Sequence, residues 1–202
     1  EEVFGVALAG PPGTGKSFIC KALAGEFKTQ VIRLDLGAVQ DKYVGSSQRY
    51  LRLALRTIKH LGHKPLFIST ANDVSAMDDA LMSRFSDVFF FDLPDRDERA
   101  TSWVINADRY GISFDSGTCT PFEDDEGWSH RNIAKACEKA AQFRLPVEQV
   151  AKTWMVSEDA RSRARLERAR RDADGKYLSA SYAGTYRRQR EEQADRFIDT
   201  EE

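Results

Sequence analysis

Apolar and polar positions alternate along the first 94 residues as they do in strands and helices that build a parallel sheet. Four short apolar runs have the length of buried strands: residues 3–9, 31–34, 66–70 and 88–91. Helical spacing of apolar positions predicts a helix over residues 17–27 and another from Ser46 or Ser47 to about His60. Strands separated by helices predict an α/β subdomain with right-handed crossovers.

Beyond Pro94 the pattern predicts helices alone. Apolar residues recur at helical spacing over residues 95–110, 128–143 and 147–156. From residue 157 arginines alternate with acidic residues, which predicts a solvated helix; the tyrosines that follow are expected to dock and the end to fray. The chain therefore divides into three predicted parts: an α/β subdomain (1–94), a small all-α subdomain (95–156) and a charged, partly disordered helical extension (157–202).

Composition excludes several classes of protein. Of 202 residues, 41% are hydrophobic and 12 are Phe, so the chain can bury a core. The net charge of −2, with acids among the arginines of the extension, makes nucleic acid an unexpected partner. No apolar run is long enough for a membrane span, and no signal peptide opens the chain. Three cysteines, at positions 20, 119 and 137, favour a reduced, cytoplasmic protein, and the start at Glu1 favours a piece of a longer one.

A phosphate-binding loop follows the first predicted strand. Residues 10–17 read G-P-P-G-T-G-K-S and satisfy G-x-x-x-x-G-K-[ST], with a strand before and a helix after. Glycines let backbone N–H groups converge on a phosphate, and the helix dipole favours the same anion. Lys16 is expected to pair with the β- and γ-phosphates and Ser17 to bind Mg²⁺. The predicted nucleotide-binding residues are Gly10, Pro11, Pro12, Gly13, Thr14, Gly15, Lys16, Ser17 and Phe18.

With this loop, later motifs in family order make the chain resemble the AAA family of P-loop ATPases, in its bacterial and phage-type branch, over about residues 3–143. The tetrapeptide K-Y-V-G at 42–45 resembles the first pore loop, where Tyr43 and Val44 would grip a threaded polypeptide. The resemblance implies ATP and Mg²⁺ as ligands, a ring-shaped homo-oligomer that is a hexamer by family habit, and an unknown protein substrate or adaptor.

Three further residues take roles from the same resemblance. Asn72, in S-T-A-N-D after the third strand, resembles sensor 1, which orients the attacking water. Arg84, in S-R-F, resembles an arginine finger that reaches a neighbouring subunit's nucleotide, in a segment shorter than many relatives have. Arg131, in G-W-S-H-R-N, resembles sensor 2, which touches the γ-phosphate from the helical lid. The resemblance implies catalytic roles for Lys16, Asn72 and Arg84.

One expected motif is missing. The family's Walker B strand ends in Asp-Glu, but residues 60–65 lead directly into the sensor-1 strand and no such strand occurs elsewhere. Without it, residues 31–34 are expected to pair directly with residues 66–70 in a four-stranded sheet. Asp35 and Asp73 are the acids expected near the carboxyl ends of strands. The loss of the acidic pair puts hydrolysis in question, although nucleotide binding can survive it.

Four hypotheses follow for the function. The first is an ATPase that remodels or threads a protein. The alternative is a hydrolysis-deficient ATP-binding scaffold or regulatory module. A small-molecule kinase ranks lower, because the chain shows a pore-loop-like segment where an acceptor-binding lid is needed, and an internally deleted product that folds poorly is the fourth. His60 and His63 are read as solvent-exposed histidines, because no third metal ligand is close in sequence.

Overall fold

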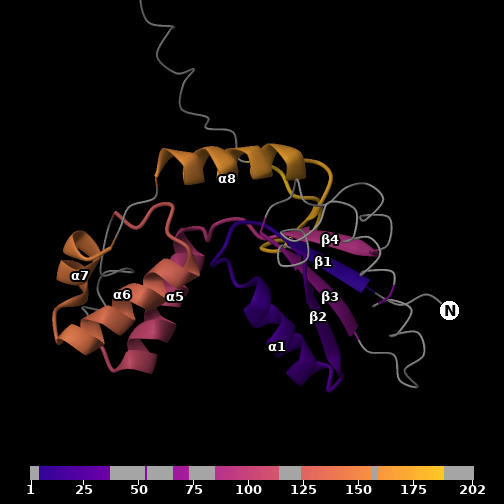
Figure 1. The fold of residues 1–202 in the computed structure, drawn as a ribbon. Helices are drawn as coiled ribbons and strands as arrows, with labels where there is room; N and C mark the ends of the chain where they lie inside the picture. Colours follow the sequence, from indigo (N-terminus) through magenta and orange to yellow (C-terminus); the bar gives the residue numbers. More distant parts are fainter. Residues whose placement is uncertain are drawn as a thin grey trace, which may run out of the picture.

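The sheet contains five parallel strands in the order β2-β3-β1-β4-β5 (Figure 1). The computed structural model describes residues 5–36, 53, 66–72, 85–113, 124–155 and 159–188. The strands are β1 (Gly5–Ala9), β2 (Val31–Asp35), β3 (Leu66–Ala71), β4 (Asp87–Phe90) and β5 (Leu178–Ser179). β1 lies between β3 and β4, so its small and aliphatic side chains are covered on both faces, as its uninterrupted apolar run predicts.

The pairing of β2 with β3 is as predicted. The register joins Val31 to Leu66 and Asp35 to Thr70, and β3 pairs with β1 on its other side. The two strands that flank the missing motif therefore share a regular parallel ladder. The sheet closes over the missing strand without leaving a gap in its hydrogen bonds.

Alternation along the strands divides the core into two faces. Leu8 and Ile68 pack against Cys20 of helix α1 (Lys16–Glu26) on one face. The other face, with Ala9 and Phe67, packs against the C-terminal part of the chain. Figure 1 shows α1 below the sheet and α8 above it.

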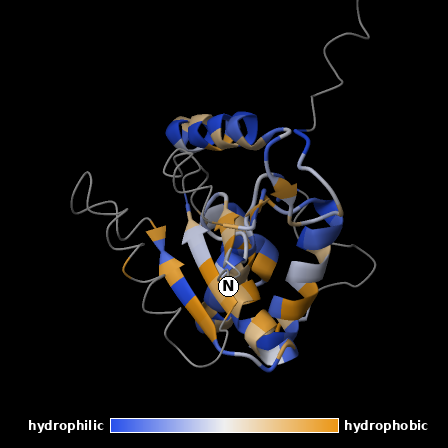
Figure 2. Ribbon diagram, turned by 90° about the vertical axis from the view of Figure 1, so that its right-hand side faces the viewer, coloured by the Kyte–Doolittle hydropathy of each residue, from blue (hydrophilic) through white to orange (hydrophobic). Residues whose placement is uncertain are grey.

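The C-terminal segment belongs to the core of the sheet. Helix α8 (Ala160–Ala173) is mostly hydrophilic, at the top of Figure 2, and buries only a narrow apolar stripe. Four residues of this segment are buried in the same hydrophobic cluster as the sheet: Ala169, Ala173, Tyr177 and Tyr186. Tyr177 and Tyr186 bracket β5, which pairs with β4. The predicted four-stranded sheet is therefore wrong by one strand, because two residues after α8 extend the β4 edge.

Three helices form a separate hydrophobic cluster around Trp103, which is fully buried. They are α5 (Arg96–Tyr110), α6 (His130–Phe143) and α7 (Val147–Thr153). Asp95 caps α5 in a reciprocal capping box, and Ser129 caps α6. Asp125 anchors the cluster, because it accepts bonds from the Trp103 indole and the Arg99 guanidinium, both at 2.8 Å. These caps explain why the helices begin within two residues of their predicted starts.

Parts of the sequence interpretation fall outside the described residues. The predicted helix over residues 46–60 is represented only by Leu53, which lies in a helix. His60, His63 and Cys119 are also outside it. Within the described residues, no helix combines the length and the apolar character needed to cross a membrane.

Candidate nucleotide-binding site

The loop between β1 and α1 is held at its start by both neighbouring strands. Gly10 donates its N–H to the Ala71 carbonyl at 3.2 Å, and Phe91 donates to Ala9 at 2.8 Å. Gly10 has φ +140°, and a Cβ there would lie 2.1 Å from the Phe91 carbonyl oxygen. Only glycine fits this close approach, so the first glycine of the motif fixes where the loop leaves the sheet.

The N-terminal end of α1 is arranged for an anion. Gly15 adopts φ +94° as the N-cap, and the helix has no side-chain cap and no acidic residue in its first turn. Helices α5, α6 and α8 instead begin on Asp95, Ser129 and Asp159, whose side chains accept backbone N–H bonds. The unpaired N–H groups and the helix dipole of α1 therefore favour a negative ligand. Ser17 is exposed beside them.

Lys16 lies beneath the loop and is only 5% exposed. Its ammonium group donates to the carbonyls of Gly10 at 2.7 Å and Pro11 at 2.6 Å, while the Thr14 hydroxyl donates to Pro11 at 3.0 Å. Burial, and then the nearby charge of Arg131, lower the pKa of Lys16 from 10.5 to about 8. The lysine is thus a partly desolvated cation whose present partners are neutral carbonyls, which a phosphate can replace.

The loop also touches the helical cluster. Arg131 donates its backbone N–H to the Gly13 carbonyl at 3.3 Å. A Cβ on Gly13, at φ +90°, would lie 2.7 Å from the Ser129 hydroxyl. The structure therefore brings Arg131 and Lys16 close together, although 115 positions separate them in the sequence. The packing of Gly13 against Ser129 had no signal in the sequence beyond the glycine itself.

Two other candidate residues lie at the rim of this site. Asn72 is exposed and directly follows Ala71, whose carbonyl holds the start of the loop. Phe18 is 74% exposed in the first turn of α1. Arg84, Tyr43, Val44 and Asp73 lie outside the described residues. The roles given to all of these residues stay predictions.

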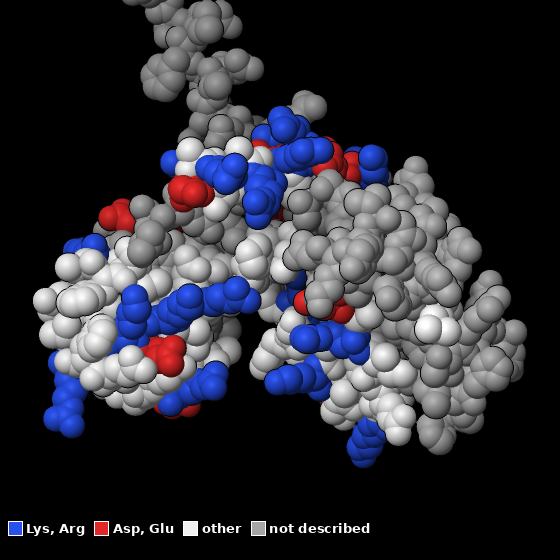
Figure 3. All heavy atoms as spheres, in the orientation of Figure 1, with Lys and Arg blue, Asp and Glu red and all other residues white. Residues whose placement is uncertain are grey.

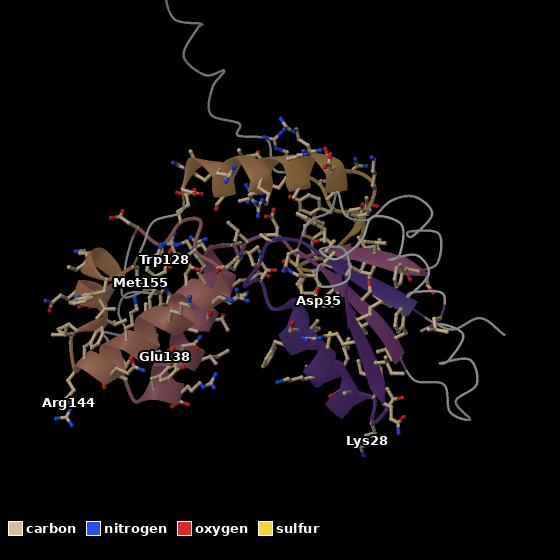
Figure 4. The ribbon with its side chains drawn as sticks, viewed as in Figure 1. Lys28, Asp35, Trp128, Glu138, Arg144 and Met155 are labelled. Atoms are coloured by element: carbon tan, nitrogen blue, oxygen red, sulfur yellow. The ribbon has the colours of Figure 1, made fainter. Side chains whose placement is uncertain are left out.

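Ionic contacts on the α1 face of the sheet reach the same place. Arg33 of β2 influences the Cys20 thiol, and Asp35, at the end of the strand, influences Lys16 one helical turn earlier. Figure 4 shows Asp35 near the upper end of α1. Within the described part of the chain, no group of three acidic, histidine or cysteine side chains is arranged to hold a metal by itself. Mg²⁺ suits such a site when phosphate oxygens complete its ligands.

A second polar cluster lies behind the site, where β4 leads into α5. Asp92 accepts bonds from the Arg170 guanidinium at 3.0 Å and the Tyr186 hydroxyl at 2.6 Å. Phe90, two residues before it, contacts the Tyr186 ring at 4.6 Å between centroids. The C-terminal segment thus holds the connection between sheet and helical cluster. Sequence reasoning missed this contact, whose partners are 78 and 94 positions apart.

The opposite side of α8 carries positive charge. Figure 3 shows Lys and Arg side chains gathered over this helix. The acids among them are engaged locally, since Glu167 pairs with Arg170 at 2.8 Å and with Arg188 at 2.6 Å.

Comparison with known proteins gives the same family over the first part of the chain. Residues 6–68 match the model of the ATPase family associated with various cellular activities (AAA). The chain is 25% identical over 151 residues to a katanin p60 ATPase-containing protein (A-like 2) of Xenopus laevis, covering 68% of this chain and 30% of that protein. It is 35% identical over 72 residues to the proteasome-activating nucleotidase of Aeropyrum pernix, covering 36% of this chain and 18% of that protein. The chain therefore spans less than a third of these relatives.

Solved structures show the same fold. The crystal structure of the FIGL-1 AAA domain in complex with ADP has a TM-score of 0.53 at 18% identity, covering 82% of this chain and 71% of that one. The FIGL-1 AAA domain in a second structure has a TM-score of 0.55 at 17% identity, covering 81% and 75%. At this identity the likeness establishes the fold alone.

Proposed function

The chain contains an AAA ATPase domain, and from that premise we propose that it binds ATP with Mg²⁺ and hydrolyses it to drive remodelling or threading of a protein substrate. The observation that carries the nucleotide site is the loop of residues 10–15, which joins a central strand to an uncapped helix and encloses Lys16. A triphosphate there gains backbone N–H donors, a helix dipole and a desolvated cation.

The residues of the site take distinct parts in this proposal. Lys16 exchanges the carbonyls of Gly10 and Pro11 for β- and γ-phosphate oxygens. Ser17, exposed at the helix start, would hold Mg²⁺, which supplies charge stabilisation for the phosphoryl group. Arg131 approaches the same phosphates from the helical cluster, and Asn72 orients the attacking water. Each group acts by position and charge, which carry most of the catalysis in phosphoryl transfer.

The protein substrate and the ring belong to the same proposal. Both relatives named above are ATPase or nucleotidase components by their names, and AAA proteins generally act on proteins as rings. In such an assembly Arg84 would serve a neighbouring subunit's nucleotide, and Tyr43 with Val44 would line a central pore. Concentration-dependent mass in the presence of ATP tests the assembly, and turnover by Arg84→Ala tests the finger.

A second candidate function is an ATP-binding scaffold or regulatory module without turnover. The observation in its favour is the absence from the sequence of an apolar strand ending in Asp-Glu. General-base help alone contributes about 10²–10⁴-fold to rate, so a chain without its acid can bind and not hydrolyse. The two candidates share the loop and differ in chemistry alone.

Two measurements on one preparation separate the candidates. Equilibrium titration with a fluorescent ATP analogue measures binding, and steady-state phosphate release with and without Mg²⁺ measures turnover. Turnover that Lys16→Ala abolishes supports the ATPase. Saturable binding that Lys16→Ala removes, with no phosphate release by the unmodified chain, supports the module. No saturable binding by the folded chain refutes both.

A further inference from the structure

The strand that now borders β3 ends in an acid. β2 reads V-I-R-L-D, and its last residue, Asp35, stands opposite Thr70 in the register with β3. The carboxyl ends of β1, β2 and β3 lie at one edge of the sheet, because all three strands are parallel. The phosphate loop leaves β1 at that edge, so Asp35 terminates a strand on the side where the phosphates would bind.

Alternation decides which face Asp35 occupies. Ile32 and Leu34 pack into the cluster on the α8 side, whereas Val31 packs into the cluster on the α1 side. Successive side chains of a strand point to opposite faces, so Arg33 and Asp35 share the α1 face with Val31. The face of the sheet that carries Asp35 is therefore the face covered by α1.

Electrostatic neighbours fix its height along α1. Arg33 lowers the pKa of the Cys20 thiol against the larger effect of burial, and Asp35 raises the pKa of Lys16 against burial and Arg131. Lys16 and Cys20 are one helical turn apart, about 6 Å along the axis, and Arg33 and Asp35 are about 7 Å apart along the strand. The two pairs match only if β2 runs antiparallel to α1 with Asp35 beside the helix's first turn.

Magnesium chemistry gives this position a use. In P-loop NTPases the ion is held by the loop's Ser or Thr and by an Asp, together with phosphate oxygens. Ser17 lies in that same first turn, and the sequence has no Asp-Glu strand to supply the acid. We propose that Asp35 is that acid: β2 occupies the place beside β3, and its terminal carboxylate binds, with Ser17, the Mg²⁺ of the nucleotide. This inference rests on the proposed nucleotide site.

Other sheet acids among the described residues are placed elsewhere. Asp87 is the first residue of β4, at the opposite edge of the sheet from the loop. Asp92 follows β4 at the correct edge, but its carboxylate is bound by Arg170 and Tyr186 of the C-terminal segment. Asp35 therefore combines the correct edge with the correct face.

The test compares binding of a fluorescent ATP analogue in Mg²⁺ and in EDTA, which separates the metal from the phosphate cradle. Asp35→Asn is the variant, and Asp87→Asn, another strand-terminal Asp at the opposite edge, is the matched control. Loss of even an outer-shell partner of a metal ligand typically costs about 10–100-fold in metal affinity, so Asp35→Asn should reduce the Mg²⁺-dependent gain by roughly 10-fold or more. Affinity in EDTA should be unchanged or higher, because one negative charge leaves the phosphate site.

A change of metal preference gives a second readout. Asp35→Cys should bind the analogue more tightly in Cd²⁺ than in Mg²⁺, because thiolates favour soft ions. An Asp35→Asn protein that keeps the full Mg²⁺-dependent gain, or loses affinity equally in both buffers, overturns the assignment. An unmodified chain that binds in EDTA but gains nothing from Mg²⁺ also overturns it. An unmodified chain that binds in neither buffer instead overturns the nucleotide site on which it rests.

Discussion

Nucleotide affinity should depend on pH through Lys16. The free protein holds this ammonium group beneath the loop with a pKa of about 8, lowered by burial and by Arg131. A bound triphosphate surrounds the same group with negative charge and raises its pKa toward or above the ordinary value. Binding therefore takes up a proton wherever the free lysine is neutral.

The lowered pKa sets both magnitude and direction. A change from 10.5 to about 8 corresponds to about 3 kcal/mol of unfavourable free energy for the charged lysine in the folded protein. This cost is present in full below about pH 8 and is relieved as pH rises toward 10.5, so this group makes unfolding less favourable across that window. At pH 9 roughly a tenth of the free protein carries the charged lysine, so nucleotide affinity should be about 10-fold weaker than at pH 7.

Isothermal titration calorimetry with ATP measures this directly. Affinity should be constant up to about pH 7.5 and then fall, approaching about 10-fold per pH unit above pH 8. Titration at pH 8 in buffers of different ionisation enthalpy should show uptake of about half a proton per nucleotide. The γ-phosphate is already ionised in this range, so the proton comes to the protein.

Replacement of the lysine provides the control. Arginine stays charged throughout the range, so Lys16→Arg should bind with an affinity that does not fall between pH 7 and 9.5. An unmodified protein with constant affinity over that range, and no proton uptake at pH 8, would refute the reasoning. Such a result would mean that Lys16 is either hydrated in the free protein or absent from the phosphate site.

Three further substitutions test contacts around the loop. Arg131→Ala removes a positive neighbour, so the pKa of Lys16 should rise and the pH at which calorimetric affinity begins to fall should rise with it. Tyr186→Phe removes a 2.6 Å hydrogen bond to the Asp92 carboxylate and should lower the free energy of unfolding in urea by about 1.5–3 kcal/mol. Gly13→Ala places a Cβ at φ +90° against a serine hydroxyl, and differential scanning fluorimetry should show a destabilisation of about 1–3 kcal/mol.

Each of these substitutions has a matched control in the chain. Lys135→Ala removes an exposed charge one helical turn after Arg131 and should leave the pH profile unchanged. Tyr182→Phe removes the hydroxyl of a 48% exposed tyrosine and should cost less than the Tyr186 change. Gly25→Ala falls in α1 with no atom within 4 Å and should stabilise the protein by about 0.5–1 kcal/mol. Equal effects of variant and control would contradict the contact concerned.

The sequence predicted those parts of the fold that local patterns determine. Buried parallel strands read as apolar runs, and Asp95 and Ser129 mark helix starts through their capping chemistry. Direct pairing of β2 with β3 was predictable because the missing strand left two apolar edges that need partners. These inferences rest on interactions between residues that are close in sequence, or on the general need to fill a sheet.

Contacts between distant segments were not predictable from the same patterns. An arginine-rich stretch reads as a solvated helix, since the buried Ala169 and Ala173 add little to its apolar pattern. Nothing in the sequence around Tyr186 indicates that its hydroxyl reaches Asp92, or that two residues before it pair with β4. In the site, the loop motif indicates Lys16, but only the strand order places Asp35 beside it.

The same strand order links the missing motif to the C-terminal segment. A sheet shortened by one strand keeps its ladder by bringing β2 against β3, but its faces still need cover. The segment with α8 and β5 supplies part of that cover, with small residues that let the helix approach closely and two tyrosines packed beside Phe90 and Phe67. It also holds Asp92, where β4 leads to the helices that carry Arg131. The charged stretch is therefore a structural neighbour of the nucleotide site, since it orders the connection through which loop and helical cluster meet.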